Sequence, residues 1–289
     1  FKMKLVWAAF TLGVIFILSI GGCAQSSLSV DESKNRPSSL QLAKNAAWIE
    51  QVILPQRPDG FEIFSLRNLK TPGNGILNIY IEGDGHVWDR GLPSEDPTPL
   101  KAIALEMALQ QATGAVAYLA RPCQFIGVGK YINCTPIQWT DRRFSAEAVA
   151  DLNHAVDVLK HKVGAQKIRL VAYSGGAAIS LLIASKRSDV VGLITVAGNL
   201  DIDAWANYHR LSPLRGSLNP VSYISQTQGL PQIHFVGSRD GIVPPSLTQD
   251  FVKRYPSNMP VQVITIPNND HACCWVEQWS SLWNQAVKD

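Results

Sequence analysis

The chain has 289 residues, of which 46% are hydrophobic and 17% are charged, a balance typical of a globular protein with a large core. Its formal net charge of +3 is too small to favour nucleic-acid binding, and no basic run with interleaved aromatic residues points to it. We therefore expect a globular protein without a nucleic-acid partner, and we see no internal repeat that would indicate an array.

The N-terminal residues have the pattern of an export signal. Two lysines precede an apolar or small run over residues 5–20, which ends at Gly21-Gly22-Cys23. A charged start and an apolar run predict a secretory signal peptide over residues 1–22. The run is shorter than the roughly 20 residues of a membrane span, although an uncleaved anchor helix is the alternative.

The end of this run resembles the lipobox of bacterial lipoproteins. The resemblance implies cleavage before Cys23, a lipid-modified Cys23 and attachment to a membrane. By the same resemblance, Ala24 rather than an aspartate favours the outer membrane, facing the periplasm or the cell surface. Residues 24–40 are rich in serine and polar residues, so we assign residues 23–47 to a lipidated, flexible tether and 48–289 to the folded domain.

Within the domain, strand-like and helix-like segments alternate. Predicted strands are 61–66, 76–81, 115–120, 167–172, 190–197, 233–236 and 261–266, and predicted helices are 99–112, 146–163 (with Ser145 as N-cap), 177–184, 246–255 and 275–287. This alternation predicts one α/β domain, a mainly parallel central sheet with helices on both faces. The loop 72–75 is hairpin-like, and the polar segment 198–229 is at most a small lid.

Ser174 lies where a strand-like stretch meets a helix-like one, in Ala172-Tyr173-Ser174-Gly175-Gly176. Small residues on both sides permit a tight turn, which lifts a serine hydroxyl above the end of a sheet. An ordinary turn is the alternative. A nucleophilic serine needs a histidine to take its proton and a carboxylate to orient that histidine.

His271 is the predicted base, because it follows the strand 261–266 and a short loop, where open α/β sheets place their sites. His86, which follows an early strand, is its main rival. Asp240 is the predicted acid, because it directly follows a strand and glycines lie on each side of it. Asp201 and Asp203 are alternatives, whereas Asp270 is next to His271 and is expected to point away.

Acyl transfer also needs backbone donors for the oxyanion. The N–H of Gly175 is one candidate, and the second is expected in the loop Glu82-Gly83-Asp84-Gly85, at Asp84 and next at Gly85. A carboxylate at Asp84 is unfavourable beside a developing negative charge unless it points away.

An oxyanion loop, a serine, an acid and a histidine in this order resemble the α/β-hydrolase superfamily. The resemblance covers roughly residues 48–289 and includes the acid loop Asp-Gly-Ile-Val-Pro at 240–244. The sequence departs from the family pattern in two places. Ala172 replaces the first glycine of the elbow, the tight turn that carries the serine, and the loop 82–85 replaces His-Gly-Gly-Gly. The resemblance implies an α/β-hydrolase fold and a serine hydrolase that cleaves a carboxylic ester or related acyl bond of a small molecule without a cofactor. The alternatives are a catalytically silent binding lipoprotein and a peptidase or thioesterase of the same fold.

Four cysteines remain besides Cys23. If the protein is exported, Cys123 and Cys134 are expected to form a disulfide, whereas Cys273 and Cys274 either bridge as neighbours or remain free thiols. No C-x₂-C spacing favours a metal site.

The aromatic residues Trp88, Trp139, Trp205 and Tyr208 indicate either an apolar or aromatic substrate pocket or ordinary packing. Three arginines, Arg121, Arg142 and Arg143, lie in the irregular segment 121–143. Either these arginines bind an anionic substrate, or they lie on a solvent-exposed face of the loop, which is the simpler interpretation.

Overall fold

The computed structural model describes residues 38–127 and 133–287. The predicted signal peptide, Cys23 and most of the predicted tether lie outside these ranges. In the described part, no helix has the length and apolar character that a membrane span requires.

The α-helices are α1 (Ser39–Asn45), α2 (Ile103–Gln110), α3 (Ala146–Val163), α4 (Gly176–Ala184), α5 (Ile202–Tyr208), α6 (Pro245–Val252) and α7 (Trp275–Ala286), with 3₁₀ helices at Pro136–Gln138 and Pro220–Thr227. The strands are β1 (Ile49–Ile53), β2 (Ile63–Arg67), β3 (Ile76–Ile81), β4 (Trp88–Asp89), β5 (Leu92–Pro93), β6 (Ala115–Leu119), β7 (Lys167–Tyr173), β8 (Val190–Val196), β9 (Gln232–Gly237) and β10 (Val261–Ile266).

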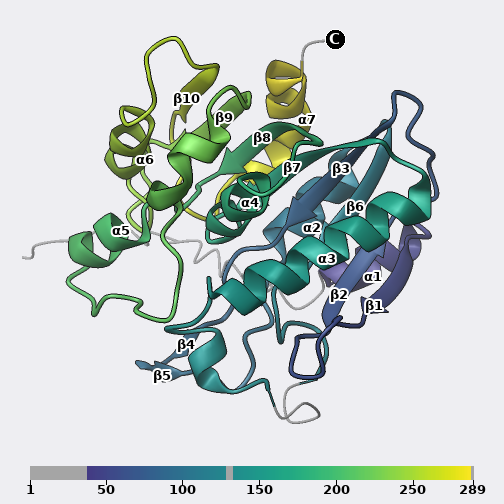
Figure 1. Ribbon diagram of the computed structural model, residues 1–289, viewed down its shortest axis with the longest axis horizontal. Helices are drawn as coiled ribbons and strands as arrows, with labels where there is room; N and C mark the ends of the chain where they lie inside the picture. Colours follow the sequence, from purple (N-terminus) through teal and green to yellow (C-terminus); the bar gives the residue numbers. More distant parts are fainter. Residues whose placement is uncertain (1–37, 128–132, 288–289) are drawn as a thin grey trace, which may run out of the picture. The chain divides into compact units, whose positions relative to one another are not determined.

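Eight strands form the central sheet in the order β1-β2-β6-β3-β7-β8-β9-β10. The pairs from β6 through β10 are parallel, whereas β1 with β2 and β2 with β6 are antiparallel. Helices α3 and α4 pack on one face, and α1, α2 and α7 pack together on the other (Figure 1). The predicted mainly parallel sheet with helices on both faces is confirmed.

The central strands are buried on both sides, as expected for parallel strands covered by helices. Ala115–Leu119 and most of Ile76–Ile81 are fully enclosed. Helix α3 begins as predicted, because the Ser145 side chain accepts a hydrogen bond from the N–H of Ala148. On the opposite face, Trp279 of α7 is buried and donates a hydrogen bond to the hydroxyl of Tyr80 on β3.

The predicted hairpin between the strands that became β2 and β3 is wrong. Strand β6 lies between β2 and β3, so the connection over residues 68–75 crosses β6, and its tight turn at 72–75 joins two strands that do not pair with each other. Asn68 ties this connection to β6, because its side chain donates to the carbonyl of Gly114 and accepts from the N–H of Val116.

The predicted flexible tether is too long at its C-terminal end. Residues 39–45 form α1 instead. The Ser39 hydroxyl donates to Glu106 on α2, and Ala43 is fully buried. These tertiary contacts stabilise a helix of seven residues, which is too short to be stable alone. Residues 38–47 therefore belong to the folded unit.

Candidate active site

Ser174 occupies a tight turn between β7 and α4. Its φ angle is +50°, in the left-handed region that non-glycine residues adopt only under constraint. The turn brings the start of α4 so close to the end of β3 that a Cβ atom on Gly176 would lie 2.5 Å from the carbonyl oxygen of Ile81. Glycine is therefore required at this position, and the serine hydroxyl is raised above the sheet edge.

The structure brings the three predicted catalytic residues together. His271 Nε2 lies 2.9 Å from Ser174 Oγ, and His271 Nδ1 lies 2.9 Å from Asp240 Oδ2. The ionised carboxylate of Asp240 is only an acceptor, so Nδ1 carries the proton and donates it. Nε2 is then free to accept the hydrogen bond from the Ser174 hydroxyl, which is the arrangement that general-base activation of a serine requires.

Asp240 is fixed by its own loop after β9. Its Oδ1 accepts hydrogen bonds of 2.8 Å from the N–H groups of Ile242 and Val243, and its side chain is fully buried. The alternative acids have other partners: Asp201 caps α5 and pairs with Arg254, and the Asp203 carboxylate accepts from Asn219.

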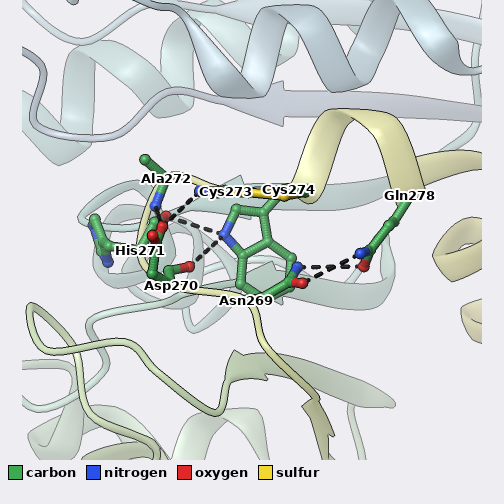
Figure 2. Close-up of a disulfide and its surroundings, with 8 residues drawn as sticks. Asn269, Asp270, His271, Ala272, Cys273, Cys274 and Gln278 are labelled. Carbon is green, nitrogen blue, oxygen red and sulfur yellow. Dashed lines mark hydrogen bonds between the residues drawn. A yellow bond between two sulfur atoms is a disulfide. The ribbon is translucent and has the colours of Figure 1, made fainter. Parts of the chain in front are cut away.

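His271 lies on the loop between β10 and α7, which several contacts brace (Figure 2). The Asp270 carboxylate accepts from the N–H groups of Ala272 and Cys273, so it points away from the imidazole as predicted. The indole of Trp275 donates to the carbonyls of Asp270 and His271. Directly after this turn, Cys273 and Cys274 form a disulfide.

Sequence reasoning missed Tyr173, which holds the His271 backbone from the side of the nucleophile. Its hydroxyl donates to the carbonyl of His271 at 2.9 Å, and its ring lies 5.4 Å from the imidazole. Tyr173 directly precedes Ser174, so one segment fixes both the nucleophile and the base. Its position in the strand before the elbow was the available signal, but an aromatic residue there also fits plain packing.

The other histidines do not contact Ser174. His86 lines the cavity beside the serine, and the imidazole of His209 is hydrogen-bonded to the carbonyl of Ile242. His234 is buried in β9 beside the Thr195 hydroxyl, and burial lowers the pKa of its imidazole to about 3. His271 is thus the histidine that the fold places at Ser174.

The two predicted oxyanion donors come from different segments, because Asp84 lines the cavity at Ser174 and Gly175 directly follows the serine. Within the described residues, neither the N–H of Asp84 nor that of Gly175 has a hydrogen-bond acceptor. The loop holding Asp84 is fixed by its neighbours: Gly85 has φ +76°, and a Cβ there would lie 2.0 Å from the carbonyl oxygen of Pro97. Gln124 also donates to the carbonyl of Gly83. The two free donors therefore lie on rigid backbone, as an oxyanion site requires.

The Asp84 carboxylate is neutralised rather than directed at the oxyanion site. Arg121 Nη1 lies 3.1 Å from its Oδ1, and Arg143 Nη1 lies 2.8 Å from its Oδ2. Arg121 and Arg143 are 4% and 8% exposed, so for these two the expected solvated loop face is wrong. Arg142, which pairs with Glu147, is the arginine at the surface.

Glu82, at the start of the same loop, is a second buried carboxyl group. It accepts from the N–H groups of Gly83 and Ala104 and from the hydroxyl of Tyr118. Burial raises the pKa of this carboxyl from 4.5 to about 7, and these hydrogen bonds act in the opposite direction. Glu82 therefore ties the oxyanion loop to the beginning of α2.

A cavity of about 850 Å³ opens at Ser174 and His271. Of the four aromatic residues singled out in the sequence, Trp88 and Trp205 line it, whereas Trp139 is buried beside a smaller cavity and Tyr208 is exposed. Trp205 comes from α5, so part of the expected lid segment 198–229 forms the cavity wall. Its other walls are mainly apolar, from residues such as Val87, Pro99, Leu100, Ile103, Leu211 and Ile242.

The second cysteine pair also forms a disulfide, between Cys123 and Cys134. The four cysteines of the domain thus form two separate disulfides. Across residues 38–127 and 133–287, no group of three or more His, Cys, Asp or Glu side chains could hold a metal ion.

No protein-family model matches the sequence, and a search of curated proteins finds no match. Solved structures do resemble the fold. An α/β serine hydrolase homologue from Coxiella burnetii aligns with a TM-score of 0.54 and 20% identity over 83% of this chain and 95% of that one. The esterase PF2001 of Pyrococcus furiosus aligns with a TM-score of 0.57 and 14% identity, over 85% and 93%. A puromycin hydrolase aligns at 0.58 and 16% identity, over 83% of this chain and 39% of that one.

The chain has an α/β-hydrolase fold. At these identities the similarity establishes the architecture, and any function has to be argued from the site itself.

Proposed function

We propose that the protein is a serine hydrolase that cleaves a carboxylic ester or related acyl bond through an acyl-enzyme. The observation that carries the proposal is the continuous hydrogen-bonded line from Asp240 through His271 to Ser174, at the mouth of a substrate-sized cavity. The names of two similar structures, a serine hydrolase homologue and an esterase, support the same class of reaction.

In this mechanism Ser174 Oγ attacks the substrate carbonyl while His271 Nε2 takes the hydroxyl proton. Asp240 holds the imidazole in place and stabilises its cationic form. The N–H groups of Gly175 and Asp84 receive the oxyanion, each contributing about 3 kcal/mol to transition-state stabilisation. His271 then passes its proton to the leaving alcohol, and water, activated by the same histidine, hydrolyses the acyl-serine.

The proposal includes an exported, membrane-tethered protein, which rests on the lipobox-like sequence ending at Cys23. Several acyl chains, each contributing roughly 0.8 kcal/mol per buried CH₂, would hold such a protein on a membrane durably. The proposed location is the outer membrane, facing the periplasm or the cell surface. Metabolic labelling with a palmitate analogue tests this part, and Cys23→Ser is expected to abolish the incorporation.

Covalent labelling by a fluorophosphonate probe tests the chemistry. We expect labelling of the wild-type protein and none of Ser174→Ala. Ser180, a buried serine on α4, provides the matched control, and Ser180→Ala should be labelled as the wild type is. A folded wild-type protein that resists the probe would instead favour a catalytically silent binding protein, whose partner capture should not depend on Ser174.

The amide alternative is carried by one specific observation, the similarity to a puromycin hydrolase. A panel of p-nitrophenyl esters, acyl thioesters and peptide amides separates the three bond types. We expect the esters to be turned over with the highest kcat/KM, and amide turnover exceeding ester turnover would move the assignment to a peptidase or amidase.

A further inference from the structure

Two guanidinium groups share the single carboxylate of Asp84 behind the oxyanion loop. The side chains of Arg121 and Arg143 are 5% and 8% exposed, and Asp84 is the carboxylate in the ion pairs found for both. No second carboxylate lies within ion-pair distance of either arginine in the described part of the chain. The cluster of Arg121, Arg143 and Asp84 therefore has one guanidinium group in excess. Glu82 attracts the charge of Arg121 from beyond ion-pair distance, but burial raises the pKa of its carboxyl to about 7, so it offsets this excess only in part at neutral pH. An enclosed charge of this kind is screened little by solvent.

Arg143 is the member of this cluster that reaches the catalytic cavity. It lines the cavity together with Ser174 and His271, whereas Arg121 is enclosed behind the loop. Its Nε donates to the carbonyl of Thr140 at 2.7 Å, and its Nη1 donates to Asp84. Within residues 38–127 and 133–287, Nη2 has no acceptor, and it is not among the nitrogens sealed away from solvent.

Aromatic rings and hydrogen bonds hold this guanidinium in place. The Phe144 ring lies 6.0 Å from its central carbon and the Trp205 ring 5.7 Å. A guanidinium fixed in this way loses little rotamer freedom when it binds an anion, so its free N–H groups are pre-organised for a planar or tetrahedral oxyanion.

The lysine that lines the cavity has a partner of its own. Lys101 Nζ lies 3.8 Å from the carboxylate of Glu106. Most of the wall is apolar, and its other polar lining residues include Glu82, Asp84, His86, Asn199 and His209. Among these groups Arg143 offers a permanent positive charge with free N–H groups beside the nucleophile.

From this arrangement we propose that Arg143 binds an anionic group, a carboxylate or a phosphate, carried by the substrate a few bonds from the scissile carbonyl. The substrate class is thus an amphiphilic ester with one anionic end, and Arg143 is a specificity-determining residue. The proposal rests on the proposed hydrolase function, and it adds to that function the chemical class of the substrate.

The first experiment compares p-nitrophenyl hemiesters of succinate, glutarate and adipate, which carry a free carboxylate, with their methyl diesters, using the full chain in detergent. A second series uses p-nitrophenyl esters in which a phosphate replaces the carboxylate at the same distance from the scissile carbonyl. We expect wild-type kcat/KM to favour an anionic ester, and Arg143→Gln to lower that preference by about 10- to 100-fold, the range of a charge-assisted hydrogen bond. The series in which Arg143→Gln causes the larger loss of preference shows whether the anion is a carboxylate or a phosphate.

Arg142→Gln removes the neighbouring arginine, which is half-buried and pairs with Glu147, and should keep the wild-type preference. Arg143→Lys retains a positive charge near Asp84 and should keep part of the preference, so it replaces Arg143→Gln if that variant does not fold. Because each preference is a ratio within one variant, a general loss of activity from a displaced Asp84 cancels. The proposal fails if the wild type prefers the methyl diesters, or if Arg143→Gln and Arg142→Gln keep equal preferences.

Failure of the hydrolase function is separately visible, as wild-type protein that the fluorophosphonate probe does not label. In that case calorimetric titration with glutarate and with inorganic phosphate decides the proposal without turnover. Heat of binding in wild-type and Arg142→Gln protein that disappears in Arg143→Gln supports the anion site. Absence of binding to the wild type overturns it.

Discussion

Glu82 makes the stability of this protein depend on pH in a direction opposite to that of most carboxylates. Burial raises the pKa of its carboxyl from 4.5 to about 7. Below pH 4.5 the group is protonated in both folded and unfolded chains, so its full contribution to stability is present. As the pH rises through about 7, the unfolded chain has already ionised and the folded chain resists ionisation, so this contribution is lost.

The magnitude follows from the difference between the two pKa values. A rise from 4.5 to about 7 corresponds to on the order of 3 kcal/mol of folding free energy above neutral pH. Glu82→Gln removes the titration and retains the shape. Its amide oxygen can accept from the N–H groups of Gly83 and Ala104, and its NH₂ can donate to the Tyr118 hydroxyl.

Urea unfolding of both proteins at pH 5, 6, 7 and 8 measures the effect. We expect the two to differ little in free energy of unfolding at pH 5, and Glu82→Gln to become more stable than the wild type by up to roughly 3 kcal/mol at pH 8. Glu50→Gln, at an exposed position of β1, is the control for a change of net charge. A wild-type-to-Glu82→Gln difference that stays constant from pH 5 to pH 8 would refute the reasoning.

Three further predictions concern the hydrogen bond between Asp240 and His271, the glycine that follows Ser174, and the disulfide between Cys123 and Cys134. Asp240→Asn leaves His271 in the wrong tautomer at Ser174 and should lower kcat about 10⁴-fold in a p-nitrophenyl ester assay, with an unchanged circular dichroism spectrum. Gly175→Ala would place a Cβ 2.0 Å from Asp84 Oδ1 and should lower kcat/KM at least about 100-fold, whereas Gly241→Ala, where nothing lies within 4 Å, should keep wild-type activity. Replacing Cys123 and Cys134 by serine opens a loop with a sequence separation of 11 and should lower the free energy of unfolding by about 3 kcal/mol, and equal urea midpoints for the variant and the oxidised wild type would contradict this.

The three proposed catalytic residues could be predicted to meet because each follows a strand that the sequence marks clearly. Ser174, Asp240 and His271 come after β7, β9 and β10, and the carboxyl ends of parallel strands meet at one sheet edge. Chain order and strand position therefore contain most of the information about which side chains meet. The structure adds the distances between them and excludes Asp201, Asp203 and His86 as their replacements.

What the sequence could not predict depends on contacts between distant segments. The hairpin between β2 and β3 was wrong because local turn residues do not say which strand pairs with which, and β6 lies between them. Helix α1 was missed because its seven residues are stabilised by contacts with α2 rather than by their own propensity. Tertiary packing decided both cases.

The pairing of Asp84 with two arginines belongs to the same category. Arg121 and Arg143 lie 37 and 59 residues further along the chain, in a segment without periodicity, so the sequence alone favoured a solvated face. Their burial has a consequence for the oxyanion loop. An unpaired carboxylate at Asp84 would oppose the negative charge that forms on the substrate, whereas the cluster of one carboxylate and two guanidinium groups has the opposite sign.

An aspartate in place of glycine at this position of the loop is therefore compatible with the proposed acyl transfer. The Asp84 carboxylate lies where a side chain on Gly175 would otherwise be, so it fills the space beside the turn after Ser174, and its two ion pairs hold the loop in place. A glycine at this position could offer the same N–H group, but it could neither hold the two arginines nor bring the positive charge of Arg143 to the cavity wall. In the proposed mechanism the loop would thus link the stabilisation of the oxyanion to the selection of an anionic substrate, and the selectivity of Arg143 variants measures that link.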